Sequence, residues 1–252
     1  ALNGGPGVCS EREVDIELPN PASAVATGVR ENFPSSDSRM FHTLTRFQDR
    51  FAIIAGGLGT EDEKPLDDVL LYNPIRNEPG IPAFKLVGRL PRPAWQHTAT
   101  LLPGADRLEG TEDDMVVLCG GTDGQEVFST IVVIFVSSET SNLVIRELPQ
   151  SMKLARSEHA AVAVGNLSLL VDGGWNRHAG KATDRLTESA ELLRLERTGD
   201  EIRVAETSIF RSLARVRHTL TLLVPDSDGR KWVLAYGGYG RNRHLDPYVP
   251  IL

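Results

Sequence analysis

The chain of 252 residues has few cysteines, few aromatic residues and no long apolar run. Its two cysteines, Cys9 and Cys119, lie far apart, so they form neither a Cys-x-x-Cys metal site nor a dense disulfide framework, and their scarcity favours a reducing compartment. No run reaches about 18 apolar residues, so no membrane-spanning helix is expected. Lys and Arg number 27 against 34 Asp and Glu. This acidic balance argues against nucleic-acid binding, because that affinity depends on neutralising phosphates.

Internal repetition is the main feature that the sequence does contain. Four apolar runs each end in a glycine doublet, and the doublets follow one another at roughly 50 to 65 residues: Gly56–Gly57, Gly120–Gly121, Gly173–Gly174 and Gly237–Gly238. A histidine stands upstream of each run, at His42, His97, His159 and His218. An arginine precedes each histidine, at Arg39, Arg92, Arg156 and Arg215. We expect these to be structural repeat positions, with the histidines bonding neighbouring repeats and lying far apart, rather than forming a metal centre.

Each repeat has the pattern of a four-stranded antiparallel unit. The histidine-containing run and the glycine-ended run are short, apolar and separated by turn residues, which predicts a hairpin. Third strands are expected at 67–74, 130–138 and 189–196, and fourth strands at 84–91, 143–149 and 202–207. The stretch 187–195 could form a helix, but the repeat register predicts a strand. The fold class is therefore all-β.

A single sheet of this size leaves its faces and edges open, and stacking such sheets around a common axis buries both faces. The pattern thus predicts a β-propeller of four-stranded antiparallel blades. We expect the glycine-ended runs to be the innermost strands, since glycine permits close approach of a neighbouring backbone.

The combination of Arg-x-x-His, a hairpin, Gly-Gly and a strand ending in Tyr-Asn-Pro resembles the kelch repeat, whose period is similar. The resemblance implies a kelch-type propeller over 14–252, with blades at about 39–91, 92–149, 156–207 and 215–252. We expect a flexible segment at 1–13 and an outer strand at 14–18. Asp246–Leu252 is a possible third strand of the last blade. Two alternatives stay open: the termini complete one blade, or the chain is part of a larger propeller.

The residues indicate no catalytic centre, cofactor or metal. The carboxylate-rich stretches 59–68 and 110–114 lack the spacing of a calcium loop, and no nucleophile or nucleotide motif is present. Some relatives with kelch-like propellers are copper radical oxidases, which need a cysteine cross-linked to tyrosine. Cys119 instead has the pattern of a small buried residue within an inner strand, so this enzyme class is the least favoured alternative.

The resemblance implies partner binding at one rim, where the loops after the glycine doublets meet the residues entering the first strands. The residues just before the repeat histidines are Phe41, Gln96, Glu158 and Arg217. The predicted rim site comprises Phe41, Trp95, Gln96, Trp175, Asn176, Arg177, Arg217, Tyr239, Arg241 and Arg243. Aromatic and arginine residues are enriched in interface hot spots, and the arginines predict a basic arc that binds an acidic peptide segment.

The function expected from this reading is that of a non-catalytic scaffold or adaptor for protein–protein interaction. The alternative is a structural accessory domain or subunit of a larger enzyme or complex, such as an RNA-modifying enzyme. We expect an intracellular location, in the cytoplasm, with the nucleus or an organelle left open.

Overall fold

The computed structural model describes residues 38–48, 50–73, 84–104, 106, 108–176, 185–240 and 248–250. The chain divides into two units, 1–37 and 38–252, and everything described here belongs to the second. The predicted flexible segment 1–13 and outer strand 14–18 lie outside the described residues. Among the residues described there is no helix that could cross a membrane.

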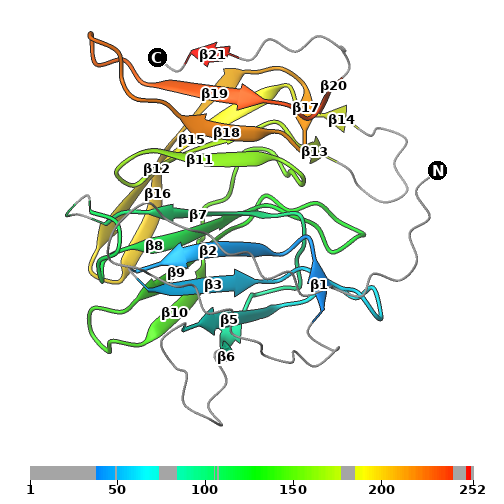
Figure 1. Ribbon diagram of the computed structural model, residues 1–252, viewed down its shortest axis with the longest axis vertical. Helices are drawn as coiled ribbons and strands as arrows, with labels where there is room; N and C mark the ends of the chain where they lie inside the picture. Colours follow the sequence, from blue (N-terminus) through cyan, green and yellow to red (C-terminus); the bar gives the residue numbers. More distant parts are fainter. Residues whose placement is uncertain are drawn as a thin grey trace, which may run out of the picture. The chain divides into compact units, whose positions relative to one another are not determined.

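Four antiparallel sheets follow one another along the chain (Figure 1). Sheet 1 contains β2 (Thr43–Phe47), β3 (Phe51–Ala55), β5 (Asp68–Tyr72) and β6 (Phe84–Arg89). Sheet 2 contains β7 (Thr98–Leu102), β8 (Met115–Cys119), β9 (Ile131–Val136) and β10 (Leu143–Glu147). Sheet 3 contains β11 (Ala160–Gly165), β12 (Ser168–Asp172), β15 (Ser189–Thr198) and β16 (Glu201–Arg211). Sheet 4 contains β18 (Thr219–Leu222), β19 (Trp232–Tyr236) and β21 (Tyr248–Pro250).

The secondary structure agrees with the prediction in type and order. The described residues form an all-β structure without helix, and each predicted hairpin joins the first and second strands of one sheet. The ambiguous stretch 187–195 contributes to β15. The possible third strand at Asp246–Leu252 is present as β21, which pairs with β19.

Short strand pairs adjoin the sheets. They are β1 (Arg39–Met40) with β4 (Leu58–Gly59), β13 (Trp175–Asn176) with β14 (Arg185–Leu186), and β17 (Arg215–Val216) with β20 (Tyr239–Gly240). In two of these pairs the residues before a repeat histidine meet the residues after a glycine doublet. The sequence patterns did not predict these short pairs.

The sheets contact one another through their first strands: β2 lies against β7, β7 against β11, and β11 against β18. The expectation that the glycine-ended runs are innermost is therefore wrong, because those runs are the second strands. Small side chains such as Ala99 and Ala161 occupy the first strands. They allow neighbouring first strands to approach closely.

Among the described residues the core consists of three clusters, one for each pair of neighbouring sheets. Sheets 1 and 2 share a cluster that includes Ile53 and Leu118, and sheets 2 and 3 share one that includes Val117 and Leu169. Strand β8 is buried along its whole length, because side chains alternate between the two faces of a strand and both faces of sheet 2 are covered. The cluster between sheets 3 and 4 is the smallest and includes Leu170 and Val233.

The first three glycine doublets join each sheet to the next. The second glycine of each donates its N–H to a carbonyl of the following repeat: Gly57 to Ala94 at 2.9 Å, Gly121 to Arg156 at 2.9 Å and Gly174 to Arg215 at 2.8 Å. This register corrects one repeat position. Ala94, rather than Arg92, is the counterpart of Arg156 and Arg215, since it lies three residues before its histidine.

Arg39 and Arg156 bond to residues of their own repeat. Arg156 is fully buried and donates to the carbonyl of Gly173 at 2.8 Å and to the Glu191 carboxylate at 2.7 Å. Arg39 donates in the same manner to the Gly56 carbonyl at 3.1 Å and to Asp68 at 2.7 Å. Because the carbonyl of Arg156 also accepts from the preceding doublet, this residue links two sheets.

Three repeat histidines bond across sheet boundaries, as predicted. The ring Nε2 of His97 lies 3.0 Å from Thr43 Oγ1, and that of His159 lies 2.9 Å from Thr98 Oγ1. Burial is the main cause that lowers the pKa of His159, and the charges of Arg156, His97 and His218 lower it further. At the third boundary His218 bonds instead to Asp172, at 3.0 Å.

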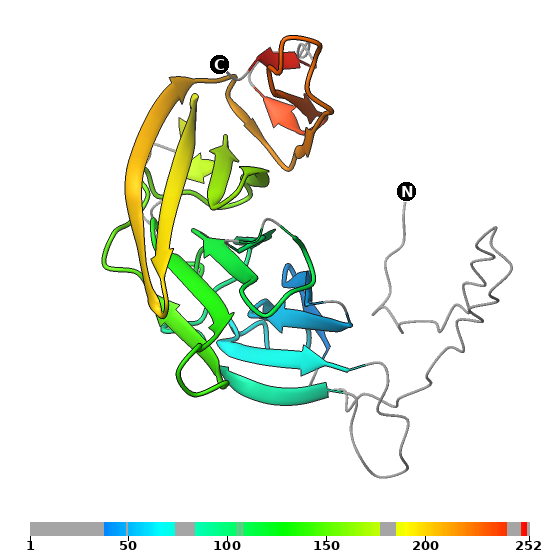
Figure 2. The same ribbon diagram turned by 90° about the vertical axis from the view of Figure 1, so that its left-hand side faces the viewer.

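The β15–β16 hairpin extends beyond its own sheet and contacts sheet 2 at the periphery, as Figure 2 shows. Arg197 donates to the carbonyls of Asp113 at 2.6 Å and Val136 at 3.2 Å. Asp200 accepts from Ser137 Oγ at 2.5 Å and from the Ser138 N–H at 2.8 Å. These bonds tie sheets 2 and 3 together independently of their shared core.

Candidate partner-binding site

The residue before each repeat histidine has a left-handed backbone. Phe41, Gln96, Glu158 and Arg217 have φ values of 56°, 56°, 54° and 56°. Residues other than glycine seldom adopt this conformation, yet here it recurs once in every repeat. We call these four residues the left-handed row.

The left-handed row is joined by backbone hydrogen bonds that cross from sheet to sheet. Gln96 N–H donates to the Phe41 carbonyl at 3.1 Å, Glu158 N–H to the Gln96 carbonyl at 3.1 Å, and Arg217 N–H to the Glu158 carbonyl at 2.9 Å. These bonds lie outside the strand ladders and link residues of successive repeats. The backbone of the row is therefore fixed, whatever side chain each position carries.

The loops after the glycine doublets lie directly beside the row. In each repeat the residue two before the histidine pairs antiparallel with the residue after the doublet: Met40 with Leu58, Trp95 with Thr122, Ser157 with Trp175 and Val216 with Tyr239. The structure thus brings together the two groups of residues that the sequence analysis assigned to one rim.

One end of the row is aromatic. The Phe41 and Trp95 rings come from neighbouring repeats, with centroids 5.4 Å apart and planes tilted by 41°. Phe41 is 46% exposed, which leaves a large apolar side chain facing solvent. Such rings give much contact area to a partner at a low cost in conformational entropy.

The other end of the row is charged. The Glu158 carboxylate accepts from Gln96 Nε2 at 2.6 Å and from Arg217 Nη2 at 3.0 Å, and Arg217 Nε donates to it as well. The bonds to Glu158, and then its charge, raise the pKa of the exposed Arg217 guanidinium, and Tyr239 is close enough to contribute. Tyr239 is 69% exposed.

Arg217, the one described arginine of the predicted basic arc, is therefore paired with Glu158. Arg177, Arg241 and Arg243 lie outside the described residues. Trp175 and Asn176 are described as strand β13, beside the row. The predicted rim site did not include Glu158, although its position before His159 places it in the same series as Phe41 and Gln96.

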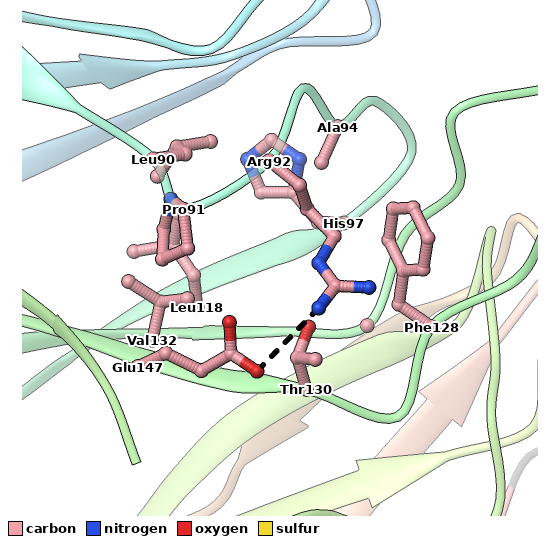
Figure 3. A pocket seen from close by; sticks show the side chains of 11 residues that line it. Leu90, Pro91, Arg92, Ala94, His97, Leu118, Phe128, Thr130, Val132 and Glu147 are labelled. Atoms are coloured by element: carbon pink, nitrogen blue, oxygen red, sulfur yellow. Dashed lines mark ion pairs between the residues drawn. The ribbon is translucent and has the colours of Figure 1, made fainter.

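A small cavity lies beneath the second repeat, where the arginine is replaced by Ala94 (Figure 3). Its volume is about 20 Å³, enough for about one water molecule. Arg92 lies at its edge, with its guanidinium 5.1 Å from the Phe128 ring and 3.8 Å from Glu147. The counterpart of Glu191 in this sheet is Val132, so both members of the buried ion pair are replaced together.

The described residues provide no arrangement suited to metal binding, since no group of three His, Cys, Asp or Glu side chains converges among them. Cys119 is buried in the core, and burial raises the pKa of its thiol to about 12. The interpretation of Cys119 as a small core residue is confirmed. Cys9 lies outside the described residues.

No family model matches this chain, and no curated protein matches its sequence significantly.

Proposed function

We propose that the chain is a kelch-type propeller module that binds a segment of a partner protein at the left-handed row. The observation that carries the proposal is the contrast between backbone and side chain along this row. Four successive repeats hold the same backbone conformation and hydrogen bonds, while the side chains are Phe, Gln, Glu and Arg. Phe41 and Arg217, at the two ends of the row, are exposed, and a fixed backbone that presents such varied side chains is suited to recognition rather than to packing.

The chemistry of the row defines the kind of segment that it would bind. The ring of Phe41, beside Trp95, offers an apolar contact. At the other end, an acidic side chain of the partner would compete with Glu158 for Arg217, because guanidinium binds carboxylates in a bidentate manner. We therefore propose a partner segment with an apolar residue followed by an acidic one. The alternative of an accessory domain in a larger assembly would use the same surface.

The proposal is tested with affinity purification and mass spectrometry from the native source, comparing the wild type with the double variant Phe41→Ala and Arg217→Glu. Both side chains are exposed, so the fold should tolerate the changes. The matched control is Arg203→Glu, because Arg203 is also an exposed arginine paired with a glutamate, Glu196, but lies on the outer strand β16.

We expect the double variant to lose a partner that the control retains. A synthetic segment of that partner should then bind the wild type and lose at least tenfold in affinity for the double variant. If both variants recover the same partners as the wild type, the row is not the binding site.

A further inference from the structure

The two end sheets expose the two unmatched halves of one repeating interface. At each internal boundary, a histidine from one repeat covers the first glycine of the previous doublet. A Cβ on Gly56, Gly120 or Gly173 would lie 3.1 Å, 2.9 Å and 2.9 Å from the ring of the following histidine. These three doublets are buried, whereas Gly237 and Gly238 are exposed, and no described atom lies within 4 Å of a Cβ built on Gly237.

Sheet 4 carries the residues that would accept a further histidine. Thr219 follows His218 as Thr43 follows His42 and Thr98 follows His97, and those two threonines bond the next histidine. Thr219 is exposed. Tyr236, which pairs with it across the hairpin, is 69% exposed, although the corresponding Ala55 and Cys119 are buried.

Sheet 1 carries the complementary half. His42 is exposed, while His97, His159 and His218 are each 6% exposed. On the same face an apolar stripe crosses all four strands in register: Leu44, Ile54, Leu70 and Leu86. Leu44 is 64% exposed and Leu86 is 51% exposed. A contiguous apolar stripe of this kind on a surface indicates an interaction site.

We propose that a second copy of this chain docks head to tail, with His42 and the apolar stripe of one copy on Thr219, Tyr236 and the Gly237–Gly238 doublet of the other. One copy carries both halves, so a single species of chain can make the contact, and the three internal boundaries show how the pieces pair. Such a contact is heterologous, and it leads to a closed ring or to a chain of copies, depending on the angle between them. The proposal is independent of partner binding at the row.

The test is sedimentation velocity over a range of concentrations with two variants that each block one half. Leu44→Glu places a charge in the stripe of sheet 1, and Tyr236→Glu places one beside the doublet of sheet 4. Both positions are exposed, so circular dichroism should show an intact fold. Ile209→Glu is the control, because Ile209 is 54% exposed on β16, away from both end faces.

The wild type and the Ile209→Glu control should self-associate as concentration rises, and each blocking variant should remain monomeric. A mixture of the two blocking variants should form a one-to-one complex, because the free half of one fits the free half of the other. Only a head-to-tail contact gives this rescue. A wild type that stays monomeric, or a mixture that does not associate, would overturn the proposal, as would equal association of all variants.

Discussion

Two places in the repeats contain replacements that compensate each other. At the boundary between sheets 3 and 4, the threonine found at Thr43 and Thr98 is Ala160, and His218 bonds to Asp172 instead. In sheet 2, the buried arginine and its carboxylate are replaced together by Ala94 and Val132. Both cases follow from the same rule, that a buried polar group needs its partner.

The first replacement predicts that Asp172→Ala destabilises the chain by about 1–3 kcal/mol, because His218 loses its acceptor. Adding Ala160→Thr should restore part of this loss, since it recreates the bond that Thr98 makes with His159. Urea unfolding of the single and double variants measures the effect. If Ala160→Thr brings no recovery in the Asp172→Ala background, the two positions do not compensate.

The second replacement predicts strong coupling between Arg156 and Glu191. Removing either partner alone leaves a buried charge unpaired and should cost about 3–5 kcal/mol. The double variant Arg156→Ala with Glu191→Val reproduces the pair found in sheet 2 and should cost less than the sum of the two single changes. A double-mutant cycle gives the coupling free energy, and additive losses would contradict the prediction.

At the scale of the element, the glycine doublet connects one sheet to the next by a backbone hydrogen bond. How well a doublet tolerates substitution depends on the contacts that the neighbouring repeat makes with it. Gly120→Ala should destabilise strongly, because the new Cβ would lie 2.2 Å from the Arg156 carbonyl oxygen and the φ is 62°. Gly237 has a φ of 74°, and a Cβ at this position would meet open space. Gly237→Ala should therefore cost only about 1–2 kcal/mol, the cost of placing a residue with a Cβ in the left-handed conformation. Thermal unfolding at concentrations where the chain is monomeric compares the two, and similar losses would refute this account.

The strands and hairpins could be predicted from the sequence because their signals are local: short apolar runs, turn residues and the doublets. The position of Ala94 could have been found by counting three residues back from His97, but the nearby Arg92 satisfied a looser pattern. Which strand of a sheet is innermost depends on packing between repeats, and the small residues of the first strands, such as Ala99 and Ala161, were the signal that the sequence analysis did not use. The pairing of Glu158 with Arg217 joins residues of two different repeats. It could not be predicted from the sequence, because it depends on how these repeats are positioned in space.

For the whole molecule, the buried histidines predict loss of stability in acid. Burial, and to a lesser extent the charge of His42, lowers the pKa of His97 to about 4, and burial lowers that of His159 well below its ordinary value. The folded state therefore disfavours protonation, and the unfolded state takes up protons first as pH falls below about 6.5. His97 alone should reduce the free energy of unfolding by about 3 kcal/mol between pH 7 and pH 4.

Urea unfolding at pH 8, 6 and 5 measures this dependence, and His97→Gln should weaken it, because glutamine does not titrate. The variant should be less stable than the wild type at pH 8 and closer to it at pH 5. Parallel curves for the two proteins would show that His97 does not contribute.

The overhanging β15–β16 hairpin has a mechanical consequence. Arg197 and Asp200 fasten sheet 3 to sheet 2 at the periphery, whereas sheet 4 adjoins sheet 3 through the smallest core cluster. Under tension applied at the C-terminal end, sheet 4 would detach before the central two sheets yield. Sheets 2 and 3 would then unfold together at a higher force, because the β15–β16 hairpin holds them to each other.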